Sequence, residues 1–407
     1  MLATLIPLFD EHMMVRSYSV FSQKDNYFLS PQRAGSARFD GIANIAGLDV
    51  IDHIGIDALS DGREVFVEVN NISLFADIPA QCKAPHDKIV LLMDPSVTPE
   101  QNYVDRITAL KKMGYKMAFR KLALPEFENY RPILSLMDYF LIDHKKVDMN
   151  KVKIYFDQRY PDTKLCAVNV ESQADYDRLC KDAKYHYYEG SFFRMPVTKA
   201  QTEVAPLKVN YINLLNVVNN DDFDLSAAAD VIGQDAALVI SLLSMVNRMT
   251  VNSEITSVRH AAAMLGQKEL KKWINTAVTR ELCADKPSEI TRVSMIRAKF
   301  AENLAPLFEM GGLAPELFLM GLFSVLDIML DKPLPEALSM VNVSKSIEKA
   351  LLQGEGEMMP VYTFIQEYEN ASWQEVSRLM IVENLDMDRV YEAYVKALQW
   401  YRDLLRA

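Results

Sequence analysis

The first half of the chain alternates short apolar runs with longer segments of mixed polarity. Six runs have the length and composition of buried strands: 65–72, 88–94, 116–122, 139–146, 164–172 and 187–193. Two earlier runs, 5–10 and 15–22, are candidates for the first strands. The segments 98–114 and 172–183 lie between runs and have apolar residues at helical spacing. Strands that alternate with helices predict βα units and a parallel sheet. We favour a (β/α) barrel over an open sheet, because no glycine-rich phosphate loop follows the first strand.

The pattern changes near residue 200. In residues 224–247 the apolar positions recur at helical spacing, and Asp224 stands where an N-cap residue is expected. The same spacing continues to the C-terminus. We therefore predict an α/β barrel in residues 1–200 and an all-helical domain in residues 201–407, with a linker at 197–206.

Composition and charge narrow the classes of function. The chain has 407 residues, half of them hydrophobic, and a formal net charge of −11. This charge argues against general nucleic-acid binding, which needs a basic face. No apolar segment approaches the ~18 residues of a membrane span, and the start lacks the basic region of a signal peptide. The four cysteines are scattered, as expected of reduced thiols. We predict a cytoplasmic protein that binds neither nucleic acid nor membranes.

The ends of the predicted strands carry the candidate site residues. They are Ser19, Gln23, Glu68, Leu91, Arg120, Lys121, Leu141, Asp143, Val168 and Glu171. Hydrolysis of a phosphodiester at a barrel mouth would need clustered carboxylates that hold one or two divalent ions. Here three carboxylates are mixed with two cations and three aliphatic side chains. The sequence therefore predicts no metal and no cofactor.

Several motifs in residues 1–200 resemble those of the EAL domain, the cyclic di-GMP phosphodiesterase barrel. They are IPLFD, YSVFSQ, FVEVNNISLFADIP, KIVLLMD, FRK, FLID, AVNVES and YEGSFFRMP. The resemblance places metal-ligand and signature acids of the family on Ser19, Leu91, Arg120, Lys121 and Val168, and a metal-ligand asparagine on Glu68. It places the catalytic lysine on Leu141 and ligand-contacting side chains on Ile6 and Gln23. Asp143 and Glu171 keep an acid, while Glu189 replaces a glutamine. The resemblance thus implies an EAL-type scaffold that has lost most catalytic positions.

The second half resembles the HDOD domain. The resemblance rests on residues 235–247, 255–266 and 317–338 and on the motif YENASW in the tail. Related HD hydrolases place a metal-binding His-Asp pair where this chain has Ser324-Val325. His260 is the single histidine after residue 200, and we interpret it as structural. The resemblance therefore implies a helical interaction surface.

These observations leave three functions to compare. The leading hypothesis is a non-catalytic signalling protein of cyclic di-GMP pathways, in control of motility or biofilm, that binds other signalling proteins through its HDOD domain; homodimerisation stays open. The alternative is a metal-independent receptor for cyclic di-GMP or another nucleotide. An active phosphodiesterase is the third.

The adjacent cations Arg120 and Lys121 raise a question of geometry. Neighbouring strand residues face opposite sides, so only one of them can point into the barrel, and the sequence leaves open which. We predict that these cations pair with the remaining acids Glu68, Asp143 and Glu171 rather than bind a phosphate. The basic residues 144–146 are interpreted as a solvated loop.

Overall fold

The computed structural model describes residues 1–29, 44–182, 185–197, 206–220, 222–249 and 255–405. The chain divides into two compact units. The barrel unit comprises Met1–Met195 and Phe364–Leu398, and the helical unit comprises Pro196–Thr363 and Gln399–Ala407.

The barrel unit contains a closed sheet of eight strands in the order β1 to β8. The strands are β1 (Leu2–Phe9), β2 (Val15–Gln23), β3 (Glu64–Glu68), β4 (Ile89–Met93), β5 (Lys116–Arg120), β6 (Tyr139–Asp143), β7 (Lys164–Val168) and β8 (Tyr187–Glu189). Neighbours from β2 to β8 are parallel, whereas β1 runs antiparallel to both β2 and β8. The predicted barrel is confirmed, and its first strand differs from a purely parallel arrangement in direction.

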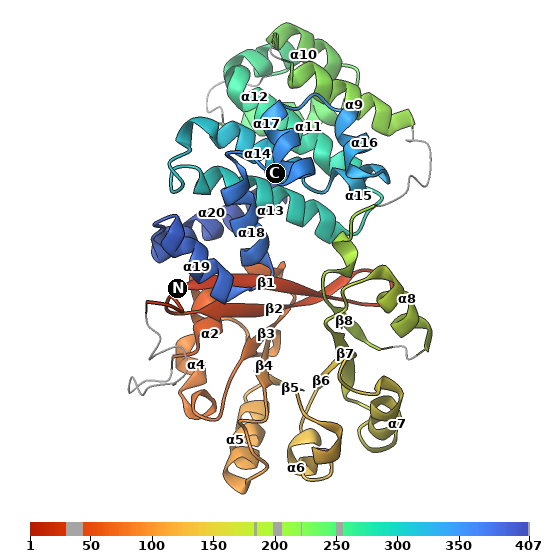
Figure 1. Cartoon of the computed structure of the whole chain (residues 1–407), viewed down its shortest axis with the longest axis vertical. Coiled ribbons are helices and arrows are strands. Elements are labelled where there is room, and N and C mark those ends of the chain that lie inside the picture. The colour runs from red at the N-terminus through yellow and green to blue at the C-terminus, as the bar shows by residue number, and fades with distance from the viewer. Residues whose placement is uncertain (30–43, 183–184, 198–205, 221, 250–254, 406–407) are drawn as a thin grey trace. The chain divides into compact units, whose positions relative to one another are not determined.

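Helices surround the barrel in the pattern that alternating βα units produce (Figure 1). They are α2 (Ala46–Ile54), α3 (Ile56–Ser60), α4 (Ile78–Gln81), α5 (Gln101–Lys112), α6 (Arg131–Leu134), α7 (Met149–Arg159) and α8 (Gln173–Asp182). The helices predicted at 98–114 and 172–183 correspond to α5 and α8. Helix α5 buries Ile107 and Leu110 one turn apart, as its apolar spacing indicates.

The C-terminal segment 364–398 belongs to the barrel unit, which differs from the predicted domain of residues 201–407. Strands β1 and β2 pair along their whole length, but β2 pairs with β3 only over Ser17–Val20. The ribbon of residues 2–4 and 21–23 therefore extends beyond the closed sheet, and Leu2 and Ala3 are nevertheless buried. The Ala3 N–H donates to the Tyr368 hydroxyl at 3.3 Å. A two-stranded ribbon is marginally stable alone, which explains why distant helices cover it.

The helical unit confirms the all-α character that the spacing predicts. Its helices are α9 (Pro206–Val218), α10 (Leu225–Ile232), α11 (Ala236–Met249), α12 (Val258–Leu282), α13 (Ser288–Leu304), α14 (Ala314–Phe323), α15 (Leu326–Leu330), α16 (Leu334–Ser339) and α17 (Lys345–Glu348). Helices α18 (Met359–Glu369), α19 (Trp373–Val382) and α20 (Met387–Leu405) follow, with α19 wholly in the barrel unit. Asp224 is the N-cap of α10, and its carboxylate accepts from Ser226 N and Ala227 N. Most of the predicted linker, residues 198–205, lies outside the described residues.

Two features of the helical unit follow from glycine. Helix α12 is broken at Gly266, whose φ of 73° interrupts the helical geometry. Helices α13 and α14 approach closely at Gly321, because a Cβ there would lie 2.6 Å from the Ala298 Cα. None of the described helices combines the length and hydropathy of a membrane span.

Candidate functional site at the barrel mouth

Strand alternation decides which predicted site residues meet inside the barrel. The interior core contains Phe66, Leu92, Ala118, Leu141 and Cys166, with Val168 packed against it. Residues two positions further along a strand face the same side, so Glu68, Arg120 and Asp143 follow the core toward the mouth. The registers Arg120↔Leu141 and Asp143↔Val168 place these residues on neighbouring strands. These three residues therefore lie at the ends of their strands on the inner side of the barrel.

The prediction for β4 was wrong by one position. Leu91 is buried, but it pairs with Val67 and Met117 and is absent from the interior core. Leu92 belongs to that core and lines the pocket described below. The apolar run 89–93 has no polar residue to mark its inner face, so the sequence alone could not fix its register.

Arg120 is the member of the cation pair that points into the mouth. Its guanidinium forms an ion pair with the Glu68 carboxylate and lies 5.9 Å from the centre of the Phe21 ring. The Arg120 side chain is 18 % exposed and that of Glu68 43 %. Lys121 is exposed and has a left-handed backbone conformation, with a φ of 60°. The choice that the sequence left open is thus settled in favour of Arg120.

Glu189 and Ser19 form a second polar contact within the barrel. The Ser19 hydroxyl donates to Glu189 Oε2 at 3.0 Å. Burial raises the pKa of Glu189 to about 7, although the Ser19 hydrogen bond and the charge of Arg120 act in the opposite direction. A carboxyl group at the position of the family's glutamine is therefore close to half protonated at neutral pH.

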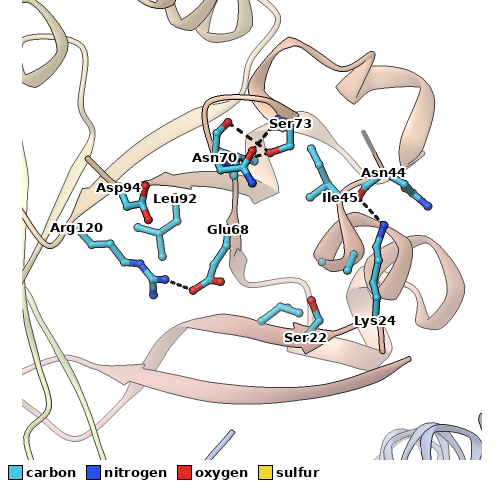
Figure 2. Close-up of a pocket in the computed structure, with 14 residues that line it drawn as sticks. Ser22, Lys24, Asn44, Ile45, Glu68, Asn70, Ser73, Leu92, Asp94 and Arg120 are labelled. Carbon is cyan, nitrogen blue, oxygen red and sulfur yellow. Dashed lines mark hydrogen bonds and ion pairs between the residues drawn. The ribbon is translucent and has the colours of Figure 1, made fainter. Parts of the chain in front are cut away.

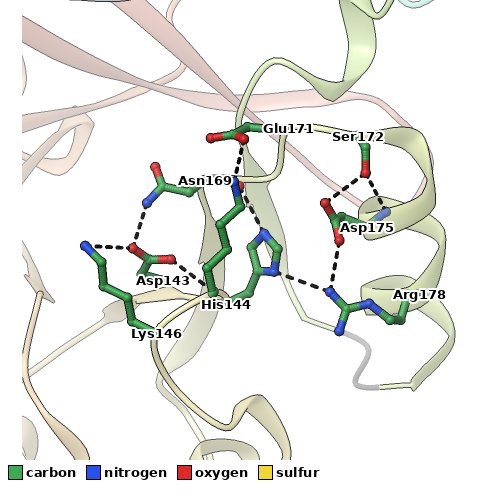
Figure 3. A network of polar contacts seen from close by, with 9 residues as sticks. Asp143, His144, Lys146, Asn169, Glu171, Ser172, Asp175 and Arg178 are labelled. Carbon is green, nitrogen blue, oxygen red and sulfur yellow. Dashed lines mark hydrogen bonds and ion pairs between the residues drawn. The ribbon is translucent and has the colours of Figure 1, made fainter.

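The remaining acids at the mouth pair with the loop cations, not with Arg120 or Lys121. Figure 3 shows the Asp143 carboxylate with Asn169 and Lys146 close to it. It accepts from Asn169 Nδ2 at 2.8 Å and forms an ion pair with Lys146 at 3.2 Å. Burial raises the pKa of Asp143, but these contacts and the Lys145 N–H outweigh it and lower the pKa overall. Lys145 forms an ion pair with Glu171.

Lys145 and Lys146 are exposed, as expected of a solvated loop, and both also form ion pairs with the surviving acids. The prediction that Arg120 and Lys121 pair with all three acids is wrong for two of them. Asp143 and Glu171 form their ion pairs with Lys146 and Lys145, and Arg120 forms its ion pair with Glu68. The loops after β6 and β7 bring these groups together, a proximity that the sequence does not encode in any motif.

A pocket of about 350 Å³ opens beside the Arg120–Glu68 ion pair (Figure 2). It is lined by the end of β2, the start of α2 and the residues that follow β3 and β4. Its charged lining residues are Lys24, Arg120, Glu68 and Asp94, two of each sign. Lys24 donates to the Asn44 carbonyl oxygen at 2.7 Å. The pocket has the size of a small-ligand site but no excess of positive charge.

Gln23 faces the C-terminal segment. Its amide nitrogen donates to the Asp25 carbonyl oxygen at 2.5 Å and to the Ser377 hydroxyl of α19 at 2.9 Å. The position that the resemblance assigns to a ligand contact is therefore used in an intramolecular contact. Sequence reasoning missed Ser377 because it lies more than 350 residues away.

The HD position of the helical unit carries a buried arginine contact. Arg297 Nη1 donates to the Ser324 hydroxyl at 2.6 Å, and Ser324 in turn donates to the Gly321 carbonyl oxygen at 2.7 Å. His260 is exposed on α12, whereas we expected it to be structural on an apolar helix. Within the described part of the chain, no three His, Cys, Asp or Glu side chains form a group that could hold a metal.

The donor set at the barrel mouth does not fit the divalent metals of the EAL family. Divalent ions prefer several carboxylate oxygens on neighbouring positions. Leucine, arginine and valine occupy the inward positions at the ends of β4, β5 and β7. The guanidinium of Arg120 is already bound to Glu68, the acid nearest to it.

Comparison with known proteins identifies the helical part. Residues 204–361 match the model of the HDOD domain family. The chain contains an HDOD domain. The prediction from residues 235–247, 255–266 and 317–338 is thus confirmed, and the match ends close to the boundary of the helical unit in α18.

The whole chain is also similar to two relatives and, in part, to a solved structure. It is 26 % identical over 418 residues to the uncharacterized protein YuxH of Bacillus subtilis, with 98 % of both chains covered. It is 25 % identical over 347 residues to the cyclic di-GMP phosphodiesterase CdgJ of Vibrio cholerae, covering 84 % of this chain and 79 % of the relative. The EAL enzyme Bd1971, solved with cAMP and cyclic di-GMP, aligns at a TM-score of 0.37 and 13 % identity. That alignment covers 48 % of this chain and 62 % of the enzyme, less than two thirds of its length.

Proposed function

We propose that the chain is a non-catalytic signalling protein of cyclic di-GMP pathways, which acts by binding other proteins through its helical unit. The observation that carries the proposal is the ion pair of Arg120 with Glu68. It places a protein cation, fixed by the fold, at the end of a strand where metal-dependent hydrolysis requires a carboxylate. The CdgJ relative, named as a cyclic di-GMP phosphodiesterase, supports the link to this pathway.

The inner surface of the mouth supports the same proposal. Metal-dependent hydrolysis needs a bound ion that activates water and stabilises the charge of the leaving group. Leu92, Leu141 and Val168 provide neither an oxygen ligand nor a proton donor. Of the acids nearby, Glu68 already forms an ion pair with Arg120, and Asp143 with Lys146.

The first experiment measures hydrolysis of cyclic di-GMP by the purified full chain with Mg²⁺ or Mn²⁺. We expect no product above a blank without protein. Turnover that Glu68→Gln removes, and that Glu128→Gln on the exterior leaves intact, would refute the proposal. The second variant controls for loss of a surface carboxylate.

The second experiment addresses the interaction with a protein partner. Ile240 and Met249 are large, exposed apolar residues on α11, and exposed apolar groups of this kind mark interaction surfaces. We expect Ile240→Lys to weaken capture of a partner by the immobilised full chain. Ile381→Lys, at another exposed isoleucine, on α19 in the barrel unit, is the control. Equal capture by both variants would assign the interaction to another surface.

The pocket favours a second candidate, a metal-independent nucleotide receptor. Arginine and lysine side chains bind phosphate oxygens without a metal, and Lys24 and Arg120 both line the pocket. Against this stands the equal number of acids in the lining. Titration calorimetry with cyclic di-GMP separates the two functions. We expect no binding at micromolar concentrations; binding that Lys24→Ala and Arg120→Ala each abolish would establish the receptor.

A further inference from the structure

The pocket beside the Arg120–Glu68 ion pair carries one further charge of each sign. Lys24 and Asp94 both line it. Arg120 and Glu68 neutralise each other, whereas neither Lys24 nor Asp94 forms an ion pair with any residue that the structure describes. Figure 2 shows Asp94 on one side of the pocket and Lys24 on the other, with Glu68 between them. The pocket therefore has an anionic side and a cationic side.

Asp94 follows β4, and the backbone holds one of its carboxylate oxygens. The Ser96 N–H donates to Asp94 Oδ1 at 2.9 Å, which orients the carboxylate. Asp94 Oδ2 has no hydrogen-bond partner among the described residues. Glu68, at the end of the neighbouring strand β3, lines the same pocket and is 43 % exposed in spite of its ion pair. An ammonium group of a ligand complements this side, because its hydrogen bond to a carboxylate is strengthened by charge.

Lys24 follows β2, and its ammonium group keeps free donors. It donates to the Asn44 carbonyl oxygen at 2.7 Å, and an ammonium group has three donors in all. Asp49 attracts Lys24 only from beyond the distance of an ion pair. Burial raises the pKa of Asp49 although the charge of Lys24 acts in the opposite direction, and the Asn44 side chain donates to the Asp49 carboxylate at 2.7 Å. A carboxylate group of a ligand complements this side.

The remaining lining includes aliphatic side chains. Val20, Ile45 and Leu92 all line the pocket, and each is buried. An aliphatic group of a ligand would leave water on contact with them, which is favourable. The volume of about 350 Å³ is at the lower end of the range of small-molecule sites, so the pocket suits a small ligand better than a dinucleotide.

The charges of the lining select against ligands that carry one sign only. A phosphodiester is purely anionic and would lie against Asp94 and Glu68, and a polyamine is purely cationic and would lie against Lys24 and Arg120. We propose that the pocket binds a small zwitterion, a free α-amino acid with an aliphatic side chain. Its ammonium group binds Asp94, its carboxylate binds Lys24, and its side chain packs on the aliphatic lining. This site is separate from the proposed signalling role and from cyclic di-GMP.

Titration calorimetry of the full chain with L-leucine tests the proposal. Two further titrants each lack one charge of leucine: 3-methylbutylamine has no carboxylate, and 4-methylpentanoate has no amine. We expect L-leucine to bind at millimolar or lower concentrations. Each of the other two compounds should bind about tenfold more weakly or worse, because each loses one hydrogen bond between charged groups. Absence of leucine binding at millimolar concentrations, or equal affinity for all three compounds, would overturn the proposal.

Variants assign the two charges of the ligand to the two sides of the pocket. Asp94→Asn keeps an acceptor for the Ser96 N–H and should weaken binding of L-leucine about tenfold or more. Lys24→Gln keeps a donor for the Asn44 carbonyl oxygen and should have an effect of the same size. Asp87→Asn and Lys112→Gln change the same charges at exposed positions outside the pocket and are the controls. Leucine affinity that the pocket variants leave at the level of the controls would place the ligand elsewhere and reject this site.

Discussion

Arg120 and Glu68 stand on strands β5 and β3, separated by β4, and their side chains meet in an ion pair at the barrel mouth. Leu92, on the strand between them, belongs to the interior core and lines the same pocket (Figure 2). The pair belongs to a wider pattern in which protein cations neutralise the acids of this mouth. Lys145 and Lys146 do the same for Glu171 and Asp143.

Arg120→Ala should lower the stability of the protein. Its loss leaves Glu68 without its partner and removes the positive charge that acts on Glu189. For a pair that is partly buried, we expect a loss of about 1–2 kcal/mol in the free energy of unfolding. Denaturant unfolding of the purified parent chain and of the variant measures this difference in free energy. Lys121→Ala, at the exposed neighbouring position, should change stability little; a larger loss for Lys121→Ala than for Arg120→Ala would contradict the assignment.

Glu189 should make stability depend on pH. Burial raises the pKa of its carboxyl from 4.5 to about 7 in the folded protein. Between these values the folded state keeps a proton that the unfolded state releases, so stability falls as the pH rises through this range and stays lower above it. The loss in the free energy of unfolding amounts to about 3 kcal/mol.

The measurement compares the unfolding free energy of the parent chain and Glu189→Gln from pH 4 to 8. Glutamine keeps an acceptor for Ser19 but cannot ionise, so the difference between the two proteins should shift in favour of Glu189→Gln as the pH rises. A difference that stays constant with pH would show that Glu189 does not titrate in this range. Glu171→Gln at the exposed loop position is the control.

The cover of the barrel by the C-terminal segment should depend on the Tyr368 hydroxyl. Tyr368→Phe removes the acceptor of the buried Ala3 N–H. An unpaired buried donor costs about 1–3 kcal/mol, so thermal unfolding should occur at a lower temperature. Tyr391→Phe is a matched control, because the Tyr391 hydroxyl is buried and has no hydrogen-bond partner among the described residues. Equal melting temperatures for both variants would mean that the Ala3 contact adds no stability.

Gly321→Ala should destabilise the helical unit. A Cβ at this position would lie 2.6–2.8 Å from backbone atoms of Ala298 and Arg297, so α13 and α14 would have to move apart. Overpacking of this kind costs about 1–3 kcal/mol or more. Gly312→Ala meets no atom within 4 Å and is the control. Circular dichroism during heating measures the melting temperature of each variant. Identical melting curves would show that the helices adjust to the added methyl group without a loss of stability.

The sequence by itself determined the order of the elements and most of the inward-facing positions. Apolar runs separated by helical segments specify a barrel, and a period of two places Glu68, Arg120 and Leu141 on one face as soon as the strand limits are known. It also indicated the HDOD domain through the motifs at residues 235–247, 255–266 and 317–338, and the N-cap of α10 at Asp224. These properties are local, because they depend only on residues that lie close together in the chain.

The tertiary structure alone decided the partners of those residues. The contact of Gln23 with Ser377 and the cover of Ala3 by Tyr368 depend on segments that are far apart in the chain. The register of β4 also depends on the folded barrel, because a uniformly apolar strand has no polar residue that marks its inner face. The return of residues 364–398 to the barrel follows from a need to bury the β1–β2 ribbon, which only the folded barrel creates. Hydrophobic burial is non-directional, so the sequence shows that a surface will be covered, and the three-dimensional packing determines by what.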